Sequence, residues 1–162
     1  MLGFCNLFNL MIATTHIIAG SAIGSQVDAP WLAFVLGFAS HHLLDAVPHL
    51  DYGDIGNKKG VPFTTWLYIG MDLTVGALLL AYFIHTPHHQ PGLVWGALGG
   101  LLPDIIDNSP LWLRYTRRWP LLKQHWQFHE FVQRYELKPN LKWLNIILQA
   151  TVIILGLAFI PY

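Results

Sequence analysis

The stretch WLYIGMDLTVGALLLAYFI, residues 66–84, decides the fold class that this sequence predicts. Its nineteen residues carry a single charge, Asp72. An apolar run of about 18–20 residues forms a helix that is long enough to cross the ~30 Å hydrocarbon core of a bilayer. Residues 143–160 form a second such run and carry no charge at all. Both runs therefore predict transmembrane helices.

The composition of the whole chain favours a membrane protein over a soluble one. Of its 162 residues, 54% are hydrophobic and 11% are charged, whereas a soluble domain carries about 25% charged residues. We expect one integral membrane domain over residues 1–162, an all-α polytopic helix bundle of about five membrane segments with an amphipathic helix on its cytoplasmic side. The membrane segments are predicted at residues 10–26, 30–45, 63–84, 91–103 and 141–160, and the amphipathic helix within residues 111–137.

The basic residues are sorted between the loops of this arrangement. All nine Lys and Arg residues lie in or beside the connections that follow the second and the fourth segments. Because cytoplasmic loops carry an excess of Lys and Arg, we expect the N-terminus in the cytoplasm and the C-terminus outside, in the cell (inner) membrane. The start of the chain lacks the basic region and cleavage site of a signal peptide, so the first segment is predicted to remain as a helix.

A His- and Asp-rich motif, SHHLLDAVPHLDYG, ends the second predicted segment at residues 40–53. His41, Asp45 and His49 are spaced four residues apart, which places them on one helical face if the helix continues through Pro48. Imidazole and carboxylate together are the ligands of zinc, and also of manganese or iron. His42 is either a packing residue or one that orients a ligand.

Four polar residues are predicted at one level of the membrane. At a rise of about 1.5 Å per residue, Asp45, Asp72 and Asp104 all lie beneath the cytoplasmic face, and His16 belongs to the same layer. Charges inside a bilayer usually mark function, although helix caps or a structural polar cluster would explain them too. Asp104 and Asp107 follow Pro103, which we expect to end or bend its helix.

A third motif, HWQFHE at residues 125–130, lies on the predicted amphipathic helix. His125 and His129 are four residues apart and so share one helical face, as the two His residues of many zinc sites do. Glu130 is a candidate general base, although a solvated charge is an equally good interpretation. His85, with the two His residues after it, falls in a loop on the opposite side of the membrane and is left out of the site.

The order of these motifs resembles the integral membrane metal-dependent hydrolases typified by YdjM. The resemblance covers most of the chain, although PDIID and HWQFH differ from the family's usual PDID and HRGxTH. It implies that the family's site residues correspond to His16, Asp104, Asp107, His125 and His129. The segment HHLLDAVPHLD is also similar, over about ten residues, to zinc-dependent phospholipases C, which implies His41, Asp45 and His49 as ligands.

These motifs predict a membrane-embedded hydrolase that uses two or more divalent ions, zinc first and manganese or iron next. Such ions lower the pKa of a bound water to about 7 and polarise a phosphoryl oxygen, and Glu130 or Asp51 would accept the proton. The expected substrate is a small or lipid phosphoester at the cytoplasmic face, since Arg and Trp alternate near residues 112–123. The alternative is a metal-ion or proton transporter that uses the same cluster. Nucleic-acid binding is not expected, and the sequence does not indicate an oligomeric state.

Overall fold

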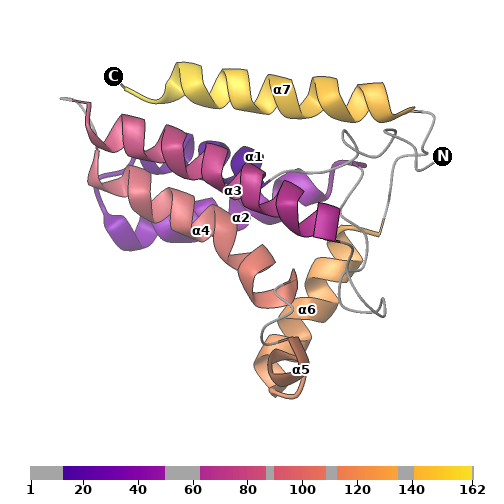
Figure 1. Ribbon diagram of the computed structural model, residues 1–162. Helices are drawn as coiled ribbons and strands as arrows, with labels where there is room; N and C mark the ends of the chain where they lie inside the picture. Colours follow the sequence, from indigo (N-terminus) through magenta and orange to yellow (C-terminus); the bar gives the residue numbers. More distant parts are fainter. Residues whose placement is uncertain (1–12, 50–62, 87–89, 109–112, 135–140, 162) are drawn as a thin grey trace.

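The computed structural model describes residues 13–49, 63–86, 90–108, 113–134 and 141–161 (Figure 1). Within these ranges the protein is all-α, as predicted, and contains no strand. The helices are α1 (Ala13–Gly24), α2 (Pro30–Asp45), α3 (Phe63–Ile84), α4 (Pro91–Asn108), α5 (Leu113–Thr116), α6 (Pro120–Val132) and α7 (Lys142–Phe159). The predicted segments 30–45 and 63–84 match α2 and α3 in full.

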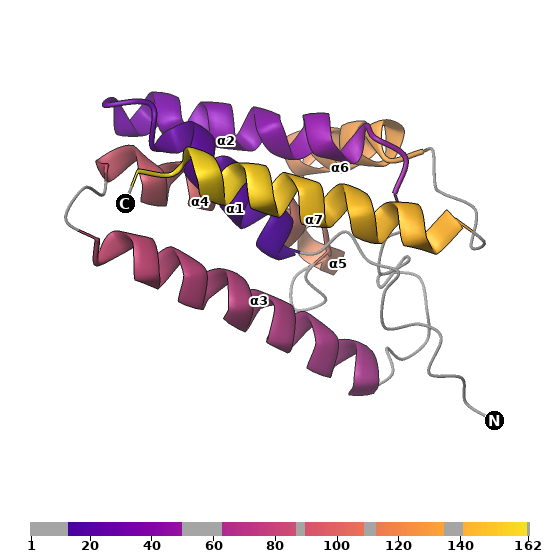
Figure 2. The same cartoon turned by 90° about the horizontal axis from the view of Figure 1, so that it is seen from above.

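Five of these helices form a bundle around α1, which contacts α2, α3, α4 and α7. They run alongside one another, and α5 and α6 lie at the end of the bundle where α2 and α4 finish (Figures 1 and 2). Successive long helices point in opposite directions, so the ends that flank the two basic connections are found at this same end.

Glycines allow α1, α2 and α4 to touch backbone to backbone. A Cβ atom added to Gly20 of α1 would lie 2.3 Å from the carbonyl oxygen of Gly96 in α4, and one added to Gly37 of α2 would lie 2.2 Å from the same oxygen. A Cβ on Gly100 would lie 2.4 Å from the carbonyl oxygen of His16. Small residues four apart, such as Gly96 and Gly100, are typical of closely packed transmembrane helices. This contact fixes the height of His16 against α4.

The outer surface of the bundle is apolar. Of the described helices, α3 is the one long and apolar enough to cross a membrane, over Trp66–Ile84, and α7 holds a shorter apolar run, Trp143–Phe159. Only 11% of the apolar window in α3 is buried inside the protein, whereas the central helix of a soluble protein is mostly buried. The other three predicted segments form helices, but they fall short of the same criterion of length and apolarity.

Pro103 does not end its helix, although the predicted segment 91–103 ends there, and α2 does not continue through Pro48. The segment predicted over residues 91–103 continues as α4 to Asn108, so Pro103, which was expected to end or bend its helix, lies buried inside it. Proline removes one backbone hydrogen bond and bends a helix without necessarily ending it, and the last turns of α4 lie towards α5 and α6 (Figure 1). In contrast, α2 ends at Asp45, three residues before Pro48, so His49 is not on the helix.

Candidate metal centre

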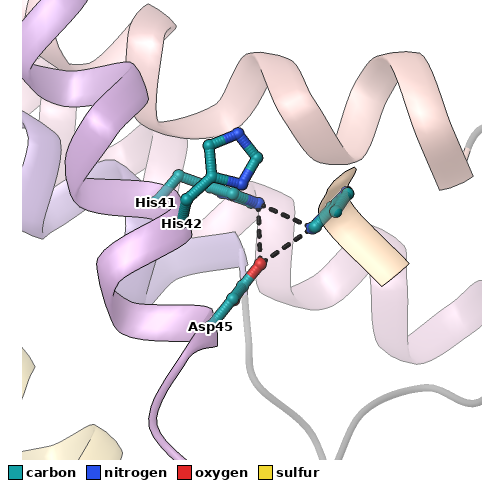
Figure 3. A group of neighbouring side chains, drawn as sticks. His41, His42 and Asp45 are labelled. Carbon is teal, nitrogen blue, oxygen red and sulfur yellow. Dashed lines mark hydrogen bonds and ion pairs between the residues drawn. The ribbon is translucent and has the colours of Figure 1, made fainter. Parts of the chain in front are cut away.

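The carboxylate of Asp45, the last residue of α2, lies at the centre of a buried group of histidines. Its Oδ2 lies 3.0 Å from His41 Nε2 and 2.8 Å from His129 Nε2, and these two nitrogens are 3.1 Å apart. Figure 3 shows this triangle of donor atoms. The other oxygen, Oδ1, lies 3.3 Å from His16 Nε2 and 3.9 Å from His49 Nε2. Residues from α1, α2, α6 and the segment after α2 therefore converge on one carboxylate.

The opposite ring nitrogen of three of these histidines is held by an acceptor. His41 Nδ1 lies 2.7 Å from the carbonyl oxygen of Gly100, and His49 Nδ1 lies 2.8 Å from that of Val47. Because a carbonyl oxygen can only accept, Nδ1 carries a proton in both rings, and Nε2 is the ring nitrogen that faces Asp45. Metal-binding histidines are oriented in this way, by a carbonyl or carboxylate on the nitrogen away from the metal.

His129 is oriented by a carboxylate. Its Nδ1 lies 2.8 Å from Asp107 Oδ2, while its Nε2 faces Asp45. Burial lowers the pKa of His129, but the hydrogen bonds with Asp107 and then Asp45 outweigh burial and raise the pKa to about 10. A positive charge is therefore strongly favoured between these groups, whether a proton or a metal ion supplies it.

The spacing of the donor atoms fits a metal ion. Tetrahedral zinc, with bonds of about 2.0–2.2 Å, separates its ligand atoms by about 3.3–3.6 Å. The atoms of His41, Asp45 and His129 are 2.8–3.1 Å apart, so shifts of a few tenths of an ångström would admit the ion. Two imidazole nitrogens and a carboxylate oxygen so close together are held by positive charge, which a proton on His129 or a bound metal ion would supply.

A second group of donor atoms shares His41 with the first. His16, His41 and Asp104 bring one ligand atom each within 4.8 Å of the other two. The rings of His16 and His41 are 4.0 Å apart, and Asp104 Oδ1 lies 3.8 Å from His41 Nε2. The side chain of Asp104 is 26% exposed, whereas the histidines beside it are buried. Asp104 therefore marks the side from which water could reach the cluster.

Asp72 was predicted as a metal ligand, but its carboxylate binds the first turn of α1. Its carboxylate accepts hydrogen bonds from the backbone N–H groups of Ala13 and Thr14 and from the Thr14 hydroxyl, at 2.6 Å for the last of these. These groups form the first turn of α1, whose N–H groups have no partner within their own helix. Asp72 belongs to neither group of converging donor atoms, so it acts as a cap supplied by a neighbouring helix.

Asp107 and His125 were also predicted as ligands. The structure places Asp107 against the far nitrogen of His129, and His125 against Asp107. Asp107 Oδ2 contacts His129 Nδ1 and lies 2.9 Å from His125 Nδ1. Neither residue is in the two donor groups. Of the predicted proton acceptors, Glu130 is exposed, and Asp51 lies outside the described residues.

The sequence interpretation missed Gln133. Its side-chain amide donates a hydrogen bond of 2.9 Å to Asp45 Oδ2. Gln133 is the residue directly after α6 and follows His129 by four positions, a spacing that keeps it on the side of His129 and could have indicated it.

Comparison with known proteins adds no relative: no family model, no curated protein and no solved structure matches the chain.

Proposed function

We propose that this chain is a membrane-embedded metal-dependent hydrolase that acts on a phosphoester at the cytoplasmic face, as the resemblance to the YdjM-like hydrolases implies. One observation carries the proposal. His41, His49 and His129 each bind an acceptor through Nδ1 and turn Nε2 towards the carboxylate of Asp45. Such an arrangement orients imidazoles for a metal ion.

The membrane placement is supported by three features of the bundle. Its outer face is apolar along α3, its helices touch through glycines, and both basic connections begin at the end that holds the cluster. A bilayer would accommodate such a surface, and the positive-inside rule would place the cluster beneath the cytoplasmic face. The N-terminus would then be cytoplasmic and the C-terminus outside.

The residues divide between holding metal and handling substrate. In this proposal His16, His41, His49, Asp45, Asp104 and His129 hold one or more divalent ions, zinc first. Bound there, the metal would supply an activated water and polarise a phosphoryl oxygen. Asp107 and the Gly100 carbonyl fix the rings of His129 and His41. The partly exposed edge at Asp104 provides the approach for water and for substrate.

The alternative, a metal-ion or proton transporter, needs a route from the cluster to the other end of the bundle. Between α1, α2 and α4 that route meets the backbone contacts of Gly20, Gly37 and Gly96. Helices in such contact leave no room for a hydrated ion between them. This packing favours a site that opens at one end, as an enzyme acting on headgroups requires.

Elemental analysis of detergent-purified protein tests the proposal. Wild-type protein is expected to retain at least one equivalent of zinc, manganese or iron, and Asp45→Ala and His41→Ala are expected to lose it. A matched control is His85→Ala, because His85 is exposed beyond the end of α3. Metal-retaining protein should then be assayed against phosphomonoesters, phosphodiesters and phospholipids. Folded wild-type protein that takes up no metal would refute the metal centre and the hydrolase together.

A further inference from the structure

His42 is a buried histidine that belongs to the same group of possible metal ligands as His41, Asp45 and His129 but lies outside the triangle of their closest atoms. It follows His41 on α2 and is only 8% exposed. Neither of its ring nitrogens has a hydrogen-bond partner among the residues that the structure describes. Figure 3 shows its ring standing beside the triangle that contains His41 and Asp45.

A packing role does not explain a histidine at this position. A neutral imidazole always carries one N–H donor and one acceptor nitrogen, and burying both without partners costs free energy. The rings of Phe38 and Phe128 lie 5.0 and 5.1 Å from that of His42, so a phenylalanine would fill the same space without that cost. The unpaired ring nitrogens of His42 therefore indicate a bound molecule that accepts a hydrogen bond from this ring.

His42 is better placed to bind a molecule that is itself bound to the metal than to bind the metal directly. One of its ring nitrogens lies within 4.8 Å of the donor atoms of His41, Asp45 and His129, but those three approach one another to 2.8–3.1 Å. An oxygen bound to the metal at about 2.0–2.2 Å could accept a hydrogen bond of about 2.7–3.2 Å from the His42 ring at this outer position.

His125 offers a second imidazole at the same place. Its ring lies 5.4 Å from that of His42, and its side chain is 18% exposed. His125 Nδ1 is 2.9 Å from Asp107 Oδ2, and its Nε2 has no hydrogen-bond partner among the described residues. Two imidazole donors beside a cation site call for a ligand with several anionic oxygens, as a phosphoryl group has.

We propose that His42, with His125 beside it, binds the oxygens of a phosphoryl group held at the metal centre. This inference rests on the proposed function and deepens it, since it assigns substrate-binding residues. A lipid headgroup and a soluble phosphate are the two sources of such a group, and both present the same oxygens to the two rings.

The test compares phosphate binding with zinc content in the zinc-loaded full-length protein. His42→Phe removes the donor and keeps a ring, whereas His42→Asn restores an N–H donor. His85→Phe is the control, because His85 lies at the far end of α3 and is exposed. Zinc is measured by elemental analysis, and inorganic phosphate binding by calorimetry. A parallel arm measures binding to nanodiscs containing phosphatidic acid, against nanodiscs of phosphatidylcholine alone.

Zinc content is expected to stay unchanged in all three variants. We expect His42→Phe to weaken phosphate binding about tenfold or more, the effect of losing a hydrogen bond to a charged group. His42→Asn should recover part of this loss, and His85→Phe should bind as the wild type does. Weaker binding by His42→Phe in either arm, or in both, supports the proposal. The arm in which binding weakens identifies the source of the phosphoryl group.

Four results would overturn it. Zinc loss in both His42 variants would make His42 a metal ligand. Equal binding of both phosphate and phosphatidic acid by His42→Phe and the wild type would make His42 a packing residue. A zinc-loaded wild type that binds neither phosphate nor phosphatidic acid would refute this inference and leave the metal centre standing. A wild type that takes up no zinc would instead refute the proposed function, and this inference with it.

Discussion

His129 Nδ1 and Asp107 Oδ2 lie 2.8 Å apart, with both side chains 2% exposed. The two residues come from α6 and α4, and their contact fixes the imidazole that α6 presents to Asp45. A helix outside the main bundle thus completes the cluster through one oriented ring. In the proposed metal centre Asp107 would therefore act through His129 rather than by binding the metal itself.

Asp107→Asn should therefore weaken zinc binding without abolishing it. Loss of a carboxylate that orients a metal-binding histidine typically costs about 10–100-fold in affinity. Competition with a chromogenic chelator measures the change, and Asp45→Asn, which removes the central carboxylate, should lose zinc altogether. If both variants lose zinc equally, Asp107 is itself a ligand, as the sequence motif predicts.

Gly100→Ala should damage both stability and the metal site. The added Cβ would lie 2.4 Å from the carbonyl oxygen of His16, so α1 must move away from α4 and carry His16 with it. We expect a loss of about 1–3 kcal/mol in the free energy of unfolding, together with lower zinc content. Thermal unfolding in detergent and elemental analysis provide the two measurements.

Gly70→Ala is the matched control for that substitution. Gly70 is in α3, and a Cβ there would meet nothing within 4 Å. Alanine is favoured over glycine in a helix by about 0.8–1.0 kcal/mol, so stability should stay the same or rise. Equal destabilisation by the two substitutions would show that the α1–α4 contact is not what Gly100→Ala disturbs.

Zinc binding should release a proton and weaken in acid. The pKa of His129 is raised to about 10 by Asp107 and Asp45 against the effect of burial, so the metal-free ring is protonated at pH 7. A metal ligand must be deprotonated. Below pH 10 each unit of falling pH therefore lowers the apparent affinity about tenfold for this one proton.

Calorimetry in buffers of different ionisation enthalpy counts the protons released. About one proton from His129 is expected at pH 7, in addition to any from other ligands, and His129→Asn should release about one fewer. Identical proton release in the two proteins would show that His129 does not give up a proton to the metal.

Asp72→Ala should reduce stability while zinc content is kept. Asp72 accepts hydrogen bonds from the first turn of α1, and the loss of a helix cap typically costs about 0.5–2 kcal/mol. Asp72→Asn keeps an acceptor oxygen and should lie between Asp72→Ala and the wild type in thermal stability. Zinc loss in a folded Asp72→Asn protein would instead restore Asp72 to the metal site.

The proposed topology predicts which surfaces are accessible from outside a cell. In a Cys5→Ser background, a cysteine at exposed Asp28, between α1 and α2, should react with a membrane-impermeant thiol reagent. A cysteine at exposed Lys123 of α6 should react only after the cells are opened. The reverse pattern would place the cluster at the outer face.

Local signals in the sequence account for much of the fold. The apolar run over residues 63–84 predicts α3 in full, and Pro30 marks the start of α2 because proline suits the first turn of a helix. Depth along each helix also follows from sequence, because the rise per residue is fixed. His16, Asp45 and Asp104 were accordingly expected at one level, and the structure brings them together.

Tertiary structure decided what each polar residue faces. Depth alone does not fix the rotation of a helix or the identity of its neighbour, so Asp72 was expected beside the histidines and instead caps α1. His49 reaches Asp45 although α2 ends before it. Residue pattern alone predicted where the helices lie and how far along each one the charges sit, because these depend on local geometry and on apolar length. The partners of Asp72 and Asp107 depend on how α1, α4 and α6 pack, and contacts between distant segments set that packing.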